Sequence, residues 1–348
     1  MQTFGHGGDI YTTNCRLDFS VNINPAGTPA GVKEALRRAA ELVERYPDPQ
    51  CGALRRAMSV RYRVPEEWLL FSNGAAELIF ALALAVRPRR AVLAEPCFAE
   101  YERALSAAGC GDIRHAALSR ECGFALTEAF ADAIPEGTEL VFLCNPSNPA
   151  GRLTERAVLT KILERCEEIG AYLVLDECFL ELTERPEAQS LLARTQTRPR
   201  LIVLRAFTKT YAMPGVRLGW GVCADEMLRE KIRACLQPWS VSVPAQEAGL
   251  AALAEDDWLE KTRALIAGER QFLRTGMEGL GLRVFDSAAN YLLFEGPEEL
   301  GARCLREGIL IRDCSNYRTL RRGDFRVAVR RREENEELLR VLQAARTE

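Results

Sequence analysis

Short runs of apolar residues alternate with helical stretches through the middle of this chain, and this pattern constrains the fold most. The runs are Trp68–Phe71, Ala91–Ala94, Leu140–Cys144, Ala171–Leu175, Leu201–Leu204 and Leu218–Cys223. The helical stretches include Ala75–Val86, Thr154–Glu168 and Asp225–Leu236. Because the runs lack polar alternation, we expect strands that are buried on both faces. The pattern therefore predicts an α/β fold, with helices covering a mostly parallel sheet.

The two ends of the chain predict a second, smaller domain. Residues 1 to about 30 are rich in Gly, Asn and Pro and predict an irregular arm, followed by a helix from Ala30 to Arg45. Beyond Pro238 the pattern predicts a long helical tract, three strands and a closing helix, at Gln246–Met277, Leu292–Phe294, Leu310–Arg312, Phe325–Val329 and Glu333–Ala345. We expect the arm and helix at 1–46 to join a small α+β domain at 238–348, beside a large domain at 47–237.

Composition excludes several classes of function. The 348 residues carry a net charge of -3 with both signs interspersed, which gives no basic surface for nucleic acid or a membrane. No apolar run approaches the roughly 20 residues needed to span a bilayer. The 12 cysteines are scattered without a C-x-x-C pair and the histidines number only 2, so no metal site is expected. Scattered thiols of this kind predict a cytoplasmic protein.

Lys209 follows the apolar run Leu201–Leu204 and is set among small and apolar residues. Only 5 of the 46 basic residues are lysines, and arginine cannot form an imine, which argues against a generic surface charge. The Lys209 amine can condense with an aldehyde, while Thr208 and Arg217 can reach a phosphate. This combination indicates a pyridoxal phosphate site. The alternative is a lysine whose stem packs on a strand end while its amine stays in water.

Other apolar runs are also followed by groups that suit this cofactor. The glycine turn at residues 72–76 opens a helix whose free N–H groups suit a phosphate. Phe98 can stack on an aromatic ring, and Asn148, in a double Asn-Pro turn, can donate to a ring oxygen. Asp176 ends a buried run, and a pyridinium N–H supplies the partner that such a carboxylate needs. Each residue alone has an ordinary structural explanation, but ligands of open α/β sheets bind where these groups would meet.

These motifs resemble those of the fold-type I, aminotransferase-like pyridoxal-phosphate enzymes over essentially the whole chain. Within that superfamily the sequence is most similar to histidinol-phosphate aminotransferases and to the threonine-phosphate decarboxylases of cobalamin synthesis. The resemblance implies that Lys209 is the Schiff-base lysine, that Asp176 pairs with the ring nitrogen, and that Asn148 contacts the ring hydroxyl. It also implies cofactor contacts from Phe98, Ala75, Ala76, Thr208 and Arg217. Tyr46 matches a tyrosine lent to the neighbouring subunit's cofactor, which implies a homodimer with shared active sites.

Two positions depart from the pattern of the aminotransferases. Position 179 is Phe, where many of them carry a Tyr whose hydroxyl touches the ring oxygen. Position 206 is Ala, where a phosphate-binding Ser or Thr is common. Neither change removes an essential group, and Phe179 fits the decarboxylase branch.

The substrate side is predicted from arginines near the C-terminus and from the arm. Arg312 and Arg326 each lie in a strand-like run, and arginine forks bind carboxylates and phosphates. The resemblance implies that Arg326 binds the amino-acid carboxylate and that Arg312 binds a distal phosphate. The alternative is that both arginines are ordinary surface charges. The segments at 6–8 and 17–27 resemble the arm of the decarboxylases, which makes His6 and Asn24 candidate phosphate contacts.

The resemblance implies decarboxylation of O-phospho-L-threonine to (R)-1-aminopropan-2-ol phosphate for cobamide assembly. Transamination of histidinol phosphate or of another amino acid is the first alternative, because both reactions use the same cofactor groups. O-phospho-L-serine is a further possible substrate. A catalytically silent cofactor-binding regulator is the alternative from another class, and the intact set of cofactor residues argues against it.

Overall fold

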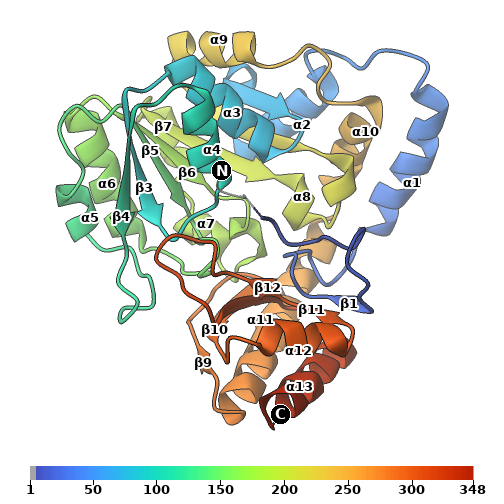
Figure 1. Cartoon of the computed structure of the whole chain (residues 1–348). Coiled ribbons are helices and arrows are strands. Elements are labelled where there is room, and N and C mark those ends of the chain that lie inside the picture. The colour runs from blue at the N-terminus through green and yellow to red at the C-terminus, as the bar shows by residue number, and fades with distance from the viewer. Residues whose placement is uncertain (1–4, 348) are drawn as a thin grey trace.

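A seven-stranded sheet forms the centre of the larger part of the molecule in the computed structural model, which describes residues 5–347 (Figure 1). Its strand order is β2-β8-β7-β6-β5-β3-β4. The strands are β2 (Leu69–Ser72), β3 (Arg90–Glu95), β4 (Asp112–Ala117), β5 (Leu140–Cys144), β6 (Tyr172–Asp176), β7 (Leu201–Ala206) and β8 (Gly219–Cys223). Neighbouring strands pair in parallel, except that β8 is antiparallel to both β2 and β7. The predicted mostly parallel sheet is confirmed.

Both faces of this sheet are buried, as the continuous apolar runs predicted. In β7, Leu201 and Val203 contribute to one hydrophobic core, whereas Ile202 and Leu204 contribute to the core on the opposite face. The second core is covered by α3 (Ala75–Val86), α4 (Glu100–Ala107) and α9 (Glu226–Cys235). Helix α6 (Arg156–Glu168) and the short α5 (Ala129–Asp132) cover the first core. Two short helices, α7 (Pro186–Gln189) and α8 (Phe207–Thr210), follow β6 and β7 along the chain.

A second, four-stranded antiparallel sheet has the order β12-β13-β10-β9 and occupies the lower part of Figure 1. Its strands are β9 (Arg283–Val284), β10 (Tyr291–Glu295), β12 (Arg312–Asp313) and β13 (Asp324–Ala328). The helices α11 (Asp256–Gly279), α12 (Leu300–Arg306) and α13 (Arg332–Thr347) pack with it. The N-terminal arm joins this region, because β1 (Leu17–Asp18) pairs in parallel with β11 (Ile309–Leu310).

The tract expected at Gln246–Met277 is helical, but it is divided into two helices. Helix α10 (Val243–Ala252) ends before α11 begins, and residues 253–255 between them contain no Gly or Pro that would signal a break. Ala245 and Ala248 of α10 lie in the core of the large sheet. Helix α10 packs on α1 (Ala30–Ala39) and on α2 (Gly52–Tyr62). By core membership, α1 and α10 therefore lie with the large sheet rather than with the small one.

Two further details differ from the sequence-based expectations. The first helix ends at Ala39 and continues only as a 3-10 turn over Ala40–Leu42, short of the expected Arg45. Strand β4 was not predicted, because its sequence carries Asp112, Arg114 and His115 and it lies at the edge of the sheet. Within residues 5–347, no helix is both long and apolar enough to cross a membrane.

Candidate active site

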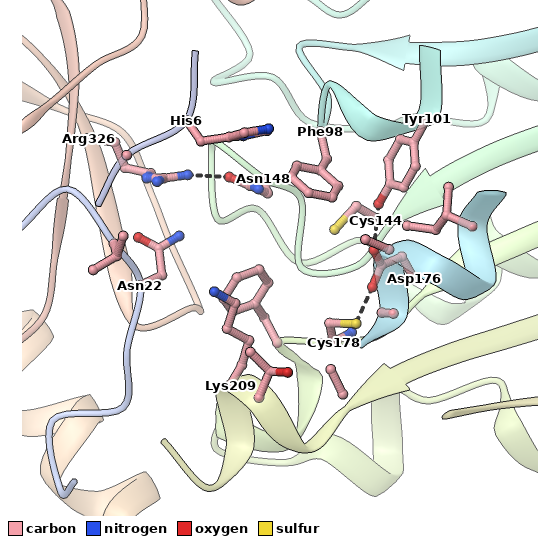
Figure 2. A pocket seen from close by; sticks show the side chains of 18 of the residues that line it. His6, Asn22, Phe98, Tyr101, Cys144, Asn148, Asp176, Cys178, Lys209 and Arg326 are labelled. Carbon is pink, nitrogen blue, oxygen red and sulfur yellow. Dashed lines mark hydrogen bonds between the residues drawn. The ribbon is translucent and has the colours of Figure 1, made fainter. Parts of the chain in front are cut away.

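A cavity of about 270 Å³ lies where the carboxyl ends of the parallel strands meet the N-terminal arm and the small sheet (Figure 2). Of the residues predicted for the site, its lining contains His6, Ala75, Ala76, Phe98, Asn148, Asp176, Thr208, Lys209, Arg217, Arg312 and Arg326. We call the part contributed by residues 75–217 the sheet wall, and the part contributed by residues 6–22 and 312–326 the arm wall. Figure 2 shows Arg326 and Asn22 on one side of the cavity and Asp176 on the other.

Asp176, the last residue of β6, lies on the sheet wall with only 4% of its surface exposed. The Tyr101 hydroxyl donates a hydrogen bond to its Oδ2 at 2.7 Å, and the backbone N–H of Cys178 donates to its Oδ1 at 2.9 Å. Two donors stabilise a buried carboxylate but do not neutralise its charge. Asp176 is therefore equipped to accept a further N–H from a bound group, such as a pyridinium ring.

Lys209 lies in α8, directly after β7, and lines the same cavity. Burial lowers the pKa of its amine from 10.5 to about 8, with a further contribution from the positive charge of Arg326. The amine nitrogen lies 5.7 Å from the centre of the Phe179 ring. A lowered pKa leaves a larger fraction of the amine neutral at physiological pH, which is the form that attacks an aldehyde.

The start of α3 forms an anion cradle with Thr208 and Arg217. Gly74 precedes the helix with φ of 81°, and a Cβ at this position would lie 2.3 Å from Nη2 of Arg217. The buried Oγ1 of Thr208 has no hydrogen-bond partner among the described residues. Free N–H groups at a helix N-terminus, an unpartnered hydroxyl and a guanidinium together suit a phosphate. These groups are of the kind that would hold the phosphate of pyridoxal phosphate.

The two predicted substrate arginines both lie on the arm wall. Arg326 of β13 is 6% exposed, and its guanidinium donates to Oδ1 of Asn148 and, at 3.0 Å, to the carbonyl oxygen of Ser20. Its Nε has no partner among the described residues. Arg312 of β12 donates to the carbonyl oxygen of Gly5 and stacks 5.5 Å from the centre of the Tyr317 ring. The cavity thus carries a second concentration of positive charge, on the arm wall.

Asn24 does not line the cavity, although the sequence made it a candidate phosphate contact. Its amide Nδ2 donates to the carbonyl oxygen of Thr210 at 2.7 Å, and its Oδ1 accepts from the N–H of Ala26 at 2.9 Å. Both polar groups of Asn24 are therefore engaged in supporting the segment that follows Lys209. Asn22, two residues earlier, lines the cavity instead, with an Oδ1 that has no partner among the described residues.

Tyr46 lies outside the cavity. It is 78% exposed, and its ring centre lies 4.9 Å from that of Trp239, which is itself 48% exposed. A contact between Tyr46 and a neighbouring subunit's cofactor remains a prediction.

Sequence reasoning missed several lining residues, including Ser20, Asn22, Tyr101, Cys144, Cys178 and Tyr317. Tyr101 was detectable in principle, because it follows Phe98 by three residues at the start of a helix and so lies one turn from it. The pKa values of the Cys144 and Cys178 thiols are raised well above the ordinary range, because burial disfavours the charged thiolate. They are therefore poor candidates for nucleophiles. No group of three or more His, Cys, Asp or Glu side chains within residues 5–347 is arranged to hold a metal ion.

Comparison with known proteins decides the family. Residues 16–342 match the family described as aminotransferase class I and II. The chain belongs to this family. A threonine-phosphate decarboxylase from Salmonella typhimurium is 38% identical over 97% of this chain and 95% of its own length. A histidinol-phosphate aminotransferase from Symbiobacterium thermophilum is 33% identical over 93% of this chain and 89% of its own length.

Solved structures agree with this family assignment. The histidinol-phosphate aminotransferase from Clostridium acetobutylicum superimposes with a TM-score of 0.89 at 26% identity, over 95% of this chain and 99% of its own. The L-threonine-O-3-phosphate decarboxylase from Porphyromonas gingivalis gives a TM-score of 0.83 at 25% identity, over 94% of this chain and 98% of its own. The resemblance read from the motifs is confirmed, and with it the fold and the expectation of a pyridoxal-phosphate-dependent enzyme.

Proposed function

We propose that the chain is a lyase that removes the carboxylate of O-phospho-L-threonine as CO₂ and leaves (R)-1-aminopropan-2-ol phosphate, for cobamide assembly. The observation that carries this proposal is the distribution of charged groups over the two walls of one cavity. The half-buried Lys209 and the buried Asp176 lie on the sheet wall, while Arg312 and Arg326 lie on the arm wall. A substrate with an amine, a carboxylate and a phosphate matches this division, and the 38% identical relative carries the name of this reaction.

The sheet wall is proposed to hold pyridoxal phosphate. Thr208, Arg217 and the N-terminus of α3 bind its phosphate, Phe98 stacks on its ring, and the Asn148 amide approaches the ring oxygen. Asp176 would keep the ring nitrogen protonated by accepting a hydrogen bond from its N–H. When bound, the cofactor supplies an electron-poor ring that accepts the electrons of the bond that breaks.

The arm wall is proposed to select which bond breaks. Arg326 holds the carboxylate of the substrate and Arg312 its phosphate, so the two arginines fix the rotation about the bond to the α-carbon. The amine of Lys209 lies in the same cavity and is available to return a proton to that carbon after CO₂ departs. This sequence of events needs no 2-oxo acid, which separates it from transamination.

Transamination of histidinol phosphate is the second candidate. It is favoured by the TM-score of 0.89 to an aminotransferase of that name. O-phospho-L-serine is a third candidate substrate, because a missing methyl group changes binding in an apolar pocket by only about 1–3 kcal/mol.

The test is to incubate pyridoxal-phosphate-loaded protein with O-phospho-L-threonine without any 2-oxo acid, and to quantify CO₂ and the amine product. The proposal predicts equal amounts of both. Absence of CO₂, together with glutamate formation from histidinol phosphate and 2-oxoglutarate, would assign the aminotransferase reaction instead. O-phospho-L-serine in a parallel reaction measures the selectivity for the methyl group.

We further propose that the enzyme is a cytoplasmic homodimer in which Tyr46 reaches the partner's cofactor phosphate. Its exposed position beside Trp239, outside its own cavity, supports this role. Tyr46→Phe removes only the hydroxyl, so we expect pyridoxal phosphate affinity to fall about three- to tenfold through the loss of one hydrogen bond to a charged group. An unchanged affinity in a protein that sediments as a monomer would contradict the shared site.

A further inference from the structure

Glu100, in the first turn of α4, is a buried carboxylate at the edge of the anion-binding cavity. It is 7% exposed, and its Oε1 lies 2.8 Å from Nε2 of His6. The guanidinium of Arg103 lies 3.5 Å from the same oxygen, on the exposed surface of the helix. Glu100 does not itself line the cavity, whereas His6 does.

A carboxylate at this position is unfavourable beside a cavity that attracts anions. The cavity lining contains Lys209, Arg217, Arg312 and Arg326, which together attract anions, and a nearby negative charge weakens that attraction. Burial of the carboxylate also carries a desolvation cost that only its hydrogen bonds offset. The position of His6 between Glu100 and the cavity accounts for the acid, because the imidazole separates its charge from a bound anion.

The hydrogen bond to Glu100 determines which ring nitrogen of His6 is free to contact a ligand. A carboxylate accepts hydrogen bonds, so Nε2 of His6 carries the hydrogen and is occupied. Nδ1 is left for a ligand, since no hydrogen bond from it to another described residue is found. Figure 2 shows the His6 ring on the arm, near Asn148 and Phe98, and its centre is 6.1 Å from that of the Phe98 ring.

The arm around His6 gives the ring few other constraints. Glycines flank it on both sides, at Gly5, Gly7 and Gly8, and glycine leaves the backbone the most freedom. The backbone is fixed near Ser20, whose Oγ accepts from the N–H of Gly8 at 2.7 Å. The side chain itself is 48% exposed, and its hydrogen bond to Glu100 is the contact that orients it.

We propose that Glu100 is a positioning residue that holds the His6 imidazole at the cavity mouth, where it contacts the phosphate of the substrate. This inference rests on the proposed function, because it takes the substrate to be a phosphate ester that reaches the arm wall. Glu100 acts through His6 and not through the cofactor or the reacting bond. Its loss therefore changes the binding of phosphate-bearing ligands and leaves cofactor affinity intact.

A double-mutant cycle tests this coupling in the pyridoxal-phosphate-loaded enzyme. We expect Glu100→Ala to raise KM for O-phospho-L-threonine about tenfold and to change kcat less than twofold, the scale of one lost charge-assisted hydrogen bond. Glu100→Gln keeps an acceptor for Nε2, and we expect a smaller rise of about threefold. In a His6→Ala background, Glu100→Ala is expected to add nothing. Arg103→Ala removes the other partner of Glu100 and serves as the matched control, with KM unchanged.

The ring of His6 provides a readout that does not depend on turnover. The chain has only 2 histidines, and His115, which bonds to Glu95 outside the cavity lining, serves as an internal reference. In the loaded enzyme the cofactor occupies the phosphate cradle, so added inorganic phosphate reports on the arm wall. We expect added phosphate to shift the NMR resonances of His6 and not those of His115. In Glu100→Ala we expect phosphate to bind about tenfold more weakly.

The outcomes separate this inference from the proposed function. An unchanged KM in a folded, cofactor-binding Glu100→Ala protein would overturn the positioning role. So would an equal, additive loss in the His6→Ala background, because it would place the effect of Glu100 elsewhere. If the wild-type enzyme releases no CO₂ but His6 still responds to phosphate in a Glu100-dependent way, the proposed substrate is wrong and the positioning role stands.

Discussion

The sheet wall and the arm wall of the cavity differ in how the chain builds them. The predicted groups on the sheet wall come from one stretch, residues 75–217, and all except Arg217, which precedes β8, follow a strand of the large sheet or begin a helix next to it. The arm wall instead combines an irregular N-terminal arm with β12 and β13 of the small sheet, more than 280 residues away along the chain. The sheet wall lies between two buried cores, whereas the arm wall is backed by a third core, which includes Phe19 and Phe325, and adds polar contacts between distant segments.

The two walls are also expected to differ in function. The sheet wall carries the groups that suit the cofactor, which both candidate reactions require. The arm wall carries the groups that contact the substrate, so the choice between decarboxylation and transamination depends on it. Substitutions on the sheet wall are therefore expected to affect every reaction of the enzyme, and substitutions on the arm wall are expected to affect individual substrates.

The largest effect is expected on the sheet wall, at Lys209. Lys209→Ala removes the amine that attaches the cofactor and moves the proton, so turnover should fall by roughly 10³-fold or more. CO₂ release under saturating substrate measures the loss. Lys161→Ala is the matched control, because that lysine pairs with Glu128 at the surface. Substantial activity in Lys209→Ala would remove the basis of the site assignment.

The next largest effect is expected on the arm wall, at Arg326. Arg326→Lys keeps the charge but loses the fork that donates to Asn148 and Ser20, so KM should rise about 10- to 100-fold. Affinity for pyridoxal phosphate should change much less. Arg322→Lys, at a guanidinium that pairs only loosely with Glu298, is the control. A parallel loss of cofactor affinity in Arg326→Lys would show that the two walls do not act separately.

A third prediction concerns the anion cradle of the sheet wall. Gly74→Ala places a methyl group against Arg217 at a residue with φ of 81°, so we expect about tenfold weaker binding of pyridoxal phosphate. Gly170→Ala is a close control, because its φ is 77° but a Cβ there meets nothing within 4 Å. Titration of the apo-protein with cofactor measures both variants. Equal losses of cofactor affinity in the two would assign the effect to backbone strain alone.

The smallest effect is a pH dependence set by Lys209. Its pKa is lowered to about 8, so the neutral amine increases as the pH rises through that value. The rate at which apo-protein captures pyridoxal phosphate should rise about tenfold from pH 7 to pH 9 and then level off, by the ratio of neutral amine at the two pH values. A rate that continues to rise beyond pH 10 would indicate an ordinary, solvated lysine.

Much of the sheet wall could be predicted from sequence, because burial imposes a pattern there. Continuous apolar runs marked the strands, and the residues after them had to meet at one edge. The same rule failed for β4, because Arg114 and His115 interrupt the apolar pattern of this edge strand. It also gave no sign of the break between α10 and α11, where no Gly or Pro is present.

The arm wall was less predictable, because an irregular segment has no periodicity that indicates its inward face. Asn22 and Asn24 are both flanked by apolar residues and are equivalent in pattern. Packing decides between them: Asn24 bonds to the carbonyl oxygen of Thr210, and Asn22 is left facing the cavity. The partnership of His6 with Glu100 likewise joins residues 94 positions apart, which no local pattern reveals.

The most direct test of the division between the walls is the number of CO₂ molecules that each enzyme site releases from excess O-phospho-L-threonine without a 2-oxo acid, measured together with the state of the cofactor. We expect many CO₂ molecules per site, with the cofactor still in its aldehyde form at the end. Conversion of about one equivalent per site to the aminated cofactor, with no CO₂, would contradict it and show that the arm wall directs transamination.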